Sequence, residues 1–185
     1  MNGKNGAGKS TLLRVIGGID YPDEGEVITN KTISWPVALS GGFQGSLTAR
    51  QNVRFVARLY VSSEEEVNYV ENFVEEFAEI GKYFDMPMKS YSSGMRSRIG
   101  FGLSMAFNFD YYLLDEVGAV GDRSFRKKSQ HLLDDLKQNS NIIMVSHNVK
   151  DLIRNCDVAF LVRDGKAEYF DNVQDAVEVY KAYAS

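Results

Sequence analysis

Residues 3–10 decide the fold of this chain, and they read Gly3-Lys4-Asn5-Gly6-Ala7-Gly8-Lys9-Ser10. They fit the pattern G-x-x-x-x-G-K-[ST] at every fixed position. The glycines let the backbone bend so that successive N–H groups point inward at phosphate oxygens. In this pattern the lysine, Lys9, reaches the β- and γ-phosphates of a nucleotide, and the Ser10 hydroxyl binds Mg²⁺. The stretch predicts a nucleotide-binding loop, and the alternative is a glycine-rich turn that matches by chance.

A helix is predicted directly behind this loop. The run Ser10-Thr11-Leu12-Leu13-Arg14-Val15-Ile16 is helical in pattern, and Gly17 and Gly18 end it. The positive end of a helix that begins at a phosphate loop adds to the same anion site. Because the motif match is complete and an amphipathic helix follows it, nucleotide binding is favoured over the chance turn.

Two apolar runs further along the chain predict buried parallel strands. Residues 111–114 and 142–145 are continuously apolar rather than alternating, as expected for strands that are covered on both faces. The first run ends in Asp115-Glu116 and the second in Ser146-His147. Because the carboxyl ends of parallel strands meet at one edge of a sheet, beside the phosphate loop, these side chains are candidate site residues.

Each of these polar side chains has an expected role. Asp115 is placed to hold Mg²⁺ through its water shell. Glu116 can polarise an attacking water as general base. His147 can sense the γ-phosphate and hold that water in line. The alternatives are a solvated acidic turn after the first strand and an unremarkable histidine, as we expect for His131 within a helix.

The remaining pattern predicts an α/β fold with a helical insertion. Residues 32–37 form a short strand, which Pro36 places at an edge or a strand end. Residues 47–84 and the run from Ser92 or Ser93 to Ala106 are helical. We expect a crossover helix at 125–138, a hairpin around Asp164-Gly165 and a closing helix at 173–183.

Composition is that of an ordinary globular protein of one domain. The chain has 185 residues, 44% of them hydrophobic and 25% charged. Its 21 basic and 25 acidic residues give a net charge of −4, which argues against a sequence-blind nucleic-acid binder. The single cysteine, Cys156, is expected to pack in the interior. No apolar run approaches the roughly 20 residues that cross a bilayer, so a soluble, cytoplasmic protein is expected.

The order of four further motifs narrows the class of protein. The segment Tyr91-Ser92-Ser93-Gly94-Met95-Arg96-Ser97-Arg98 resembles the ABC signature, whose usual form is L-S-G-G-Q-R-x-R. Gln44 resembles the Q-loop glutamine, residues 118–122 the D-loop, and Ser146-His147 the switch. The resemblance to ABC ATPases covers essentially the whole chain. It implies a P-loop NTPase of ABC type: a mainly parallel sheet flanked by helices, with a helical subdomain at about 47–107 in a single domain, 1–185.

The resemblance also implies how the site is assembled. Two copies close head to tail around two ATP molecules. Each site takes from one subunit residues that hold nucleotide, Gly3, Lys4, Asn5, Gly6, Ala7, Gly8, Lys9, Ser10, Thr11 and Gln44. Mg²⁺ is held by Ser10, Gln44 and Asp115, and catalysis falls to Glu116 and His147. The other subunit supplies Ser92, Ser93 and Gly94, and Asp122 of the D-loop also belongs to the nucleotide site. Ser93 and Met95 stand where glycine and glutamine are usual, which bears on rate and affinity more than on mechanism.

A closer resemblance is carried by five segments: Ser34-Trp35-Pro36-Val37, Gly41-Gly42-Phe43-Gln44-Gly45-Ser46-Leu47-Thr48, Tyr83-Phe84-Asp85-Met86-Pro87-Met88, residues 91–98 and Ala119-Val120-Gly121-Asp122. They resemble the ATP-binding subunits of bacterial capsular polysaccharide exporters; exporters of O-antigen and teichoic acid share parts of the pattern. This implies a peripheral protein on the cytoplasmic side of the inner membrane, bound to an integral-membrane permease subunit that carries the polysaccharide. Nucleic acid is not an expected partner. Rival hypotheses are a soluble non-transport ABC ATPase and a nucleotide-binding module without turnover.

Two features leave alternatives open. Arg50, Arg54 and Arg58 recur at four-residue spacing and predict a basic stripe, which either faces lipid or the membrane subunit or is a solvated helix face. Members of the family have about 40 residues before the phosphate loop, including β-strands and an aromatic residue that stacks on adenine. The N-terminal strands are therefore expected to be missing here. Weak ATP binding or low stability of the isolated chain follows, because a sheet edge lacks cover.

Overall fold

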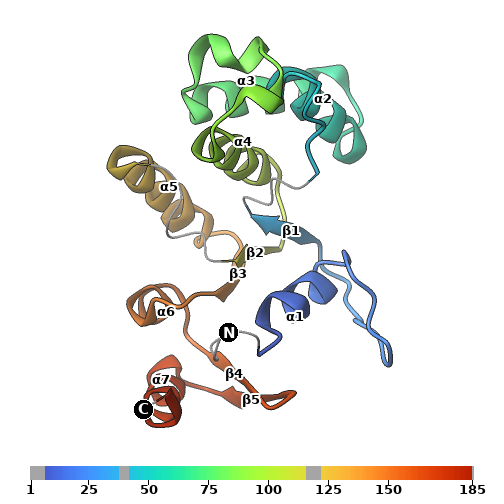
Figure 1. Cartoon of the computed structure of the whole chain (residues 1–185). Coiled ribbons are helices and arrows are strands. Elements are labelled where there is room, and N and C mark those ends of the chain that lie inside the picture. The colour runs from blue at the N-terminus through green and yellow to red at the C-terminus, as the bar shows by residue number, and fades with distance from the viewer. Residues whose placement is uncertain (1–6, 38–41, 116–121, 185) are drawn as a thin grey trace. The chain divides into compact units, whose positions relative to one another are not determined.

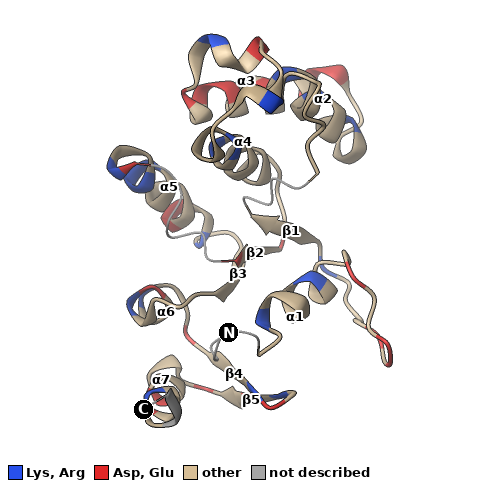
Figure 2. Cartoon of the chain, in the orientation of Figure 1, with Lys and Arg blue, Asp and Glu red and all other residues tan. Residues whose placement is uncertain are grey.

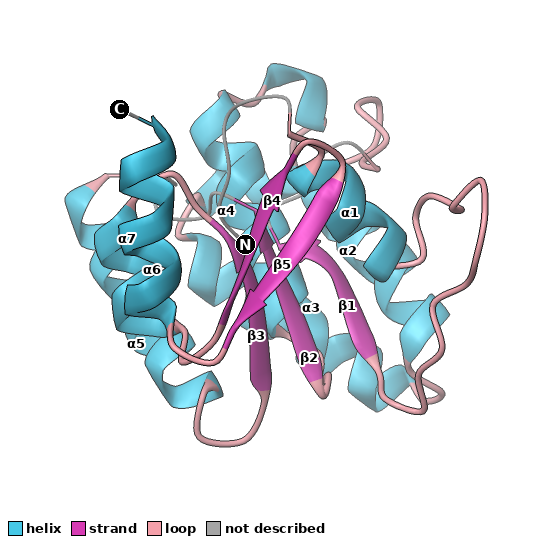
Figure 3. Ribbon diagram, turned by 90° about the horizontal axis from the view of Figure 1, so that it is seen from below, coloured by secondary structure: helices cyan, strands magenta, loops and turns pink. Residues whose placement is uncertain are grey.

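Two apolar strands that the sequence predicts, β2 (Tyr111–Asp115) and β3 (Asn141–Val145), lie side by side in parallel. Their register pairs Asp115 with Val145, so both strands end at the same edge. The computed structural model describes residues 7–37, 42–115 and 122–184. Strand β1 (Ile33–Val37) completes a sheet in the order β1-β2-β3, shown in Figure 3. The position of β1 at one side of this sheet agrees with the expectation from Pro36.

The chain divides into two compact units, which are described separately. The first comprises Met1–Pro36, Phe109–Ala119 and Leu133–Ser185, and the second comprises Val37–Asn108 and Val120–Leu132. The second unit thus takes in nearly all of the predicted 47–107 segment. Helix α5 (Arg123–Leu136) begins in the second unit and ends in the first (Figure 1).

Helix α1 (Lys9–Ile16) covers the sheet of the first unit, as the sequence predicted. Leu13 of α1 is fully buried against Leu113 of β2 and Val145 of β3. Burying side chains of this size contributes about 1.5–3 kcal/mol each. The cluster therefore fixes the helix, and with it the end of the phosphate loop, on the two strands.

A second pair of strands follows in the first unit. β4 (Ala159–Arg163) and β5 (Lys166–Phe170) are antiparallel and form the predicted hairpin. Asp164 and Gly165 both have positive φ, 49° and 73°, which is the left-handed backbone that a two-residue turn of this kind requires. Helix α7 (Val173–Ala184) packs against β4 and β5, and helix α6 (Val149–Asn155) packs against β3 and α7.

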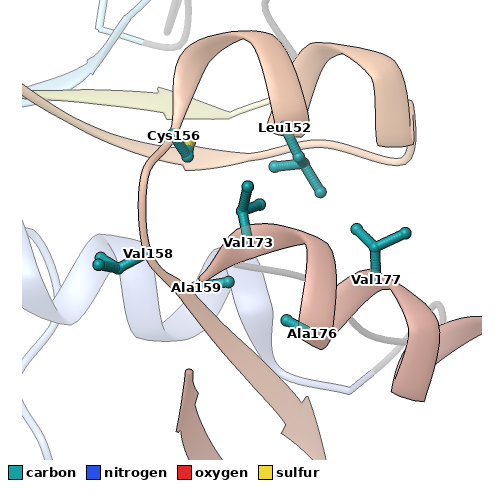
Figure 4. Close-up of a pocket in the computed structure, with 7 residues that line it drawn as sticks. All are labelled: Leu152, Cys156, Val158, Ala159, Val173, Ala176 and Val177. Atoms are coloured by element: carbon teal, nitrogen blue, oxygen red, sulfur yellow. The ribbon is translucent and has the colours of Figure 1, made fainter. Parts of the chain in front are cut away.

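Cys156 lies among apolar side chains of α6, β4 and α7, but it is half-buried rather than fully in the interior as we expected. Figure 4 shows it near Leu152 and Val173, which with Val158, Ala159, Ala176 and Val177 line a small apolar pocket. Burial raises the pKa of the Cys156 thiol, so the thiol stays protonated and unreactive at neutral pH.

A larger pocket of about 750 Å³ borders β3 in the first unit. Leu12 and Ile16 of α1, Ile143 of β3 and Phe160 of β4 are among its lining residues. The described strands form two separate sheets, β1-β2-β3 and β4-β5, and this pocket has residues of both along its walls. Apolar side chains of α1, β3 and β4 therefore line a pocket in this unit.

The second unit is helical. It contains α2 (Ala49–Tyr60), α3 (Glu64–Ala78), the 3₁₀ turns η1 (Gly81–Asp85) and η2 (Met88–Ser90), and α4 (Ser93–Met105). Thr48 with Gln51 and Ser63 with Glu66 form capping boxes, which set the starts of α2 and α3. Tyr60, the last residue of α2, is 52% exposed although it follows the buried Val53 at helical spacing.

The basic stripe of α2 pairs with carboxylates of the same unit. Arg50 binds Glu71 and Glu75 of α3 and Asp85 of η1, and Arg54 binds Glu71. Figure 2 marks the basic and acidic positions of α2 and α3 in blue and red along the ribbon. The structure therefore supports neither a lipid-facing stripe nor a purely solvated one for Arg50 and Arg54, since α3 and η1 satisfy their charges.

The interior of the second unit is aromatic. Phe77 of α3 lies with its ring centroid 5.5 Å from that of Phe101 in α4 and 5.2 Å from that of Phe125 in α5. Phe101 is fully buried.

Among the described residues, no helix has both the length and the apolar character of a bilayer-spanning segment.

We expect Phe101→Ala to lower the free energy of unfolding by about 3–5 kcal/mol, because it removes buried contacts and leaves a cavity. Phe55→Ala is the matched control, since the Phe55 side chain of α2 is 62% exposed and its loss should change stability by no more than about 0.5 kcal/mol. Urea unfolding of both variants measures the difference. Equal losses for the two would contradict the assignment of Phe101 to the core.

Candidate nucleotide-binding site

The described end of the phosphate loop leads into α1 through a left-handed glycine. Gly8 has a φ of 90°, a backbone conformation that residues other than glycine rarely adopt. Its carbonyl accepts the N–H of Leu12 at 2.9 Å, which closes the first turn of α1. Lys9 is buried, whereas Ser10 and Thr11 are exposed at the start of the helix. Residues 3–6, which the sequence also assigns to this loop, lie outside the described residues.

Packing brings this loop end to the edge where β2 and β3 end. Ala7 packs against the apolar cluster that contains Leu113 of β2 and Val145 of β3. Val145 is the register partner of Asp115. The phosphate loop and Asp115 therefore share the carboxyl edge of the sheet, as the spacing of the motifs predicted.

Asp115 carries a polar atom that protein neighbours do not satisfy. Its Oδ1 is buried and has no hydrogen-bond partner within the described part of the chain. An unpaired buried carboxylate oxygen is costly, and most such atoms in proteins have a partner. Oxygen from a carboxylate and a hydroxyl is the donor type that Mg²⁺ prefers. Asp115 and Ser10 therefore fit a bound Mg²⁺ at this edge.

His147 is positioned by a turn between β3 and α6. The Ser146 hydroxyl accepts the N–H of Asn148 at 3.0 Å, and the Asn148 side chain accepts the N–H of Lys150 at 3.0 Å, capping α6. These bonds hold His147 two residues beyond Val145 with its side chain exposed. Glu116, the predicted general base, lies outside the described residues.

The other predicted site residues belong to the second unit. Ser92 precedes α4, and its hydroxyl accepts the N–H of Met95 at 3.2 Å, so Ser92 rather than Ser93 caps the helix. Ser93 is exposed, and Gly94 lies in the first turn of the helix. An open pocket of about 520 Å³ lies here, lined by Glu79, Ile80, Tyr83, Ser92, Gly94, Met95, Arg98 and Asp122. Gln44 also belongs to this unit, and its side chain is exposed.

Asp122 has a structural use that sequence reasoning missed. Its Oδ1 accepts the N–H groups of Ser124 and Phe125, both at 3.0 Å, and so caps α5. Its Oδ2 accepts a hydrogen bond from Arg98 of the signature helix at 2.8 Å. The available signal was an aspartate directly ahead of a helical run, which is a capping pattern. Arg98, quoted only as part of the motif, joins α4 to the start of α5.

Comparison with known proteins decides the family. The profile of ABC transporters matches residues 1–119. The chain belongs to the ABC transporter family. This family comprises ABC ATPases, so this ABC protein binds ATP and hydrolyses it.

Several relatives of this ABC protein are similar over nearly its whole length. The polysialic acid transport ATP-binding protein KpsT of Escherichia coli is 62% identical, covering 98% of this chain and 81% of that protein. The capsule polysaccharide export ATP-binding protein CtrD of Neisseria meningitidis serogroup B is 45% identical, covering 97% and 82%. A solved dimeric ATP-binding cassette in a post-hydrolysis state with ADP and Pi has a TM-score of 0.73 and 24% identity, covering 90% of this chain and 82% of that one. The structural likeness establishes the ABC ATPase fold.

We expect the stability that Asp122 contributes to this ABC protein to depend on pH. The N–H of Phe125 and the hydroxyl of Ser124, together with the charge of Arg98, lower the pKa of Asp122 in the folded state. A lowered folded-state pKa gives stability that is present above the unfolded pKa and is lost as the pH falls through the folded pKa. Asp122→Ala should therefore lower Tm at about pH 7, and this loss should shrink as the pH falls below about 4.

Asp122→Asn is the matched control, because the amide oxygen can still cap α5 but carries no charge for Arg98. Its Tm at neutral pH should fall between those of the wild type and Asp122→Ala. Thermal melts across the pH range measure all three proteins. A loss in Asp122→Ala that stays constant with pH would contradict the role of the carboxylate charge.

Proposed function

We propose that this chain is the ATP-hydrolysing subunit of an ABC transporter that exports a capsular polysaccharide across the bacterial inner membrane. The observation that carries this proposal is the similarity, along nearly the whole chain, to KpsT and CtrD, both named for transport or export of a capsule-type polysaccharide. The phosphate loop and the acidic strand end support the ATPase half of the proposal. The cargo half rests on the relatives alone.

In this proposal the first unit holds the nucleotide and the reacting water. The backbone of residues 3–8 and Lys9 bind the phosphates, with Thr11 beside them. Glu116 takes the proton of the attacking water, and His147 orients that water toward the γ-phosphorus. The barrier falls chiefly because water is positioned and the developing charge is neutralised.

Mg²⁺ is the cofactor that these residues fit. We assign its protein ligands to Ser10, Gln44 and Asp115, of which Asp115 acts through the water shell. A bound Mg²⁺ would neutralise part of the charge on the phosphates. The support for this assignment is the buried, unpartnered Oδ1 of Asp115.

The second unit is proposed to serve the site of another copy. Ser92, Ser93 and Gly94, at the start of α4, donate hydroxyl and backbone N–H groups to the γ-phosphate held by the partner copy, and Asp122 lies beside them. A γ-phosphate that bridges two surfaces closes the dimer, and hydrolysis releases it. A separate integral-membrane subunit carries the polysaccharide and holds this chain at the cytoplasmic face of the membrane.

We expect Glu116→Gln to lower the rate of ATP hydrolysis by about 10²–10⁴-fold, because the amide cannot accept the proton of the water. ATP binding should persist, since Glu116 does not hold phosphate. Lys9→Ala is the contrasting variant and should lose ATP binding itself. Phosphate release and equilibrium binding of a fluorescent ATP analogue measure the two effects. Normal turnover in Glu116→Gln would remove Glu116 from the proposed mechanism.

In source cells, we expect Glu116→Gln in the complete gene to reduce surface polysaccharide while polymer accumulates inside. Export stops because the transporter cannot complete its cycle, whereas synthesis continues. Surface and intracellular polysaccharide are measured with a capsule-specific reagent in cells with equal amounts of the subunit. If export is unchanged although ATPase activity is lost, this subunit serves another cargo.

A further inference from the structure

Asn52 is a buried polar residue that the proposed mechanism does not use. It lies in the first half of α2 and is 4% exposed. Its Oδ1 accepts the backbone N–H of Gln44 at 2.8 Å, and its Nδ2 donates to the backbone carbonyl of Gln44 at 3.1 Å. Both main-chain polar groups of Gln44 are therefore bound by a single side chain eight residues away.

The hydrogen-bond partners define how the Asn52 amide is oriented. The N–H of Gln44 needs an acceptor, whereas the carbonyls of Gln44 and Thr48 need a donor. Nδ2 donates to the Thr48 carbonyl at 2.9 Å as well. Turning the amide over would place a carbonyl oxygen against two carbonyl oxygens, so only one orientation satisfies the site.

The same side chain touches the segment that leads into the signature helix. Asn52 Nδ2 lies 3.3 Å from the sulfur of Met88. The Met88 N–H donates to the carbonyl of Leu47 at 2.9 Å, and the Lys89 N–H donates to the carbonyl of Gly45 at 2.8 Å. Main-chain hydrogen bonds thus join residues 44–48 to residues 87–89, and the Asn52 side chain contacts both segments.

After Lys89 the chain reaches Ser92 within three residues. Tyr91 is buried, and its hydroxyl binds the carbonyls of Tyr83 and Met86. The next residue, Ser92, caps α4. The backbone of Gln44 and the start of the signature helix are therefore tied within one unit, through contacts that contain no flexible side chain except Met88.

The side chain of Gln44, unlike its backbone, is exposed and accessible to a ligand. It makes one hydrogen bond, from Nε2 to the Ser46 hydroxyl at 3.2 Å. A held backbone with an exposed amide is the arrangement that a residue needs if its side chain must reach a ligand from a defined point. A 1 Å misplacement of a positioning group can cost up to about 100-fold in rate.

We infer that Asn52 is a positioning residue for ATP hydrolysis, which sets the backbone of Gln44 and keeps it in register with the segment leading into Ser92. The inference rests on the proposed role of Gln44 at the nucleotide. It assigns Asn52 no contact with ATP. Its consequence is that a change at Asn52 acts on turnover through Gln44, rather than through the stability of the unit alone.

Two substitutions distinguish the contribution of the accepting oxygen of the Asn52 amide from that of its donating NH₂ group. Asn52→Leu keeps the branching at Cγ, although leucine is larger, and removes every hydrogen bond of the amide. Asn52→Asp keeps the acceptor for the N–H of Gln44 but sets a carboxylate oxygen against the carbonyls of Gln44 and Thr48. Val74→Ala is the control, since Val74 of α3 is fully buried in the same unit and no hydrogen bond of this network involves its side chain.

The test measures ATP hydrolysis by the transporter assembled with its membrane subunit, at a temperature below the Tm of every variant. We expect Asn52→Leu and Asn52→Asp to lower kcat by about 10–100-fold while ADP affinity is unchanged. Val74→Ala should keep its kcat despite a lower Tm. Hydrogen exchange should speed up at the amides of Gln44, Met88 and Lys89 in the Asn52 variants and not in Val74→Ala.

A double variant decides whether Asn52 acts through Gln44. If it does, Gln44→Ala with Asn52→Leu should be no slower than Gln44→Ala alone, because the second change has nothing left to misplace. Losses that multiply would overturn the inference and indicate a structural role. A normal kcat in Asn52→Leu, with a slow Gln44→Ala, would overturn it and leave the proposed function standing. A normal kcat in Gln44→Ala would remove both the role of Gln44 and the inference.

Discussion

The parallel pairing of β2 with β3 is the constraint on which the first unit depends. Because the two strands run the same way and end in register, Asp115 and the residues after Val145 emerge at one edge. Helix α1 is buried against both strands through Leu13, so the phosphate loop is delivered to that same edge. An antiparallel pairing of the same strands would have placed Asp115 and His147 at opposite ends of the sheet.

Polar groups near the starts of β1 and β2 join these two neighbouring strands of the sheet. The carboxylate of Asp110 accepts the N–H and the hydroxyl of Thr32, each at 2.8 Å, and the Thr32 hydroxyl accepts the N–H of Asp110 at 2.9 Å. Inside the sheet, the hydroxyl of Ser34 accepts the N–H of Leu113 at 3.0 Å. These bonds fix β1 against β2 away from the carboxyl end of β2, where Asp115 Oδ1 has no hydrogen-bond partner among the described residues.

The second unit differs from the first because its proposed site residues present backbone groups, whereas the first unit presents a carboxylate at the edge of a sheet. Side chains there bind main chain: the buried Asn52 binds Gln44, the buried Tyr91 binds the turn before it, and the exposed Asp122 caps α5. The arginines of α2 add charge pairs, and Arg50 beside Asp85 holds the pKa of that carboxyl below its usual range. Polar networks of this kind specify one arrangement of short segments that apolar packing alone would leave loose.

The sequence by itself determined the local chemistry of this protein. The glycine pattern of the phosphate loop, the two continuous apolar strands, the hairpin at Asp164-Gly165 and the helix starts all follow from short-range rules of backbone geometry, capping and burial. The candidate site residues could be named for the same reason, since each motif has a fixed spacing. The exposure of Tyr60 and the use of Asp122 as a cap could not, because they depend on which neighbours each side chain meets.

Tertiary structure alone decided how distant segments are joined. The ion pairs of the α2 arginines are formed with carboxylates of α3 and η1, which lie 10–35 positions further along the chain. The hold of Asn52 on Gln44, and of Lys89 on Gly45, likewise needed the folded backbone, because an asparagine in a helix shows no partner in its sequence. The physical reason is common to both: hydrogen bonds and ion pairs are selected by atomic distance in the fold, and spacing along the chain specifies that distance only within one helix, strand or turn.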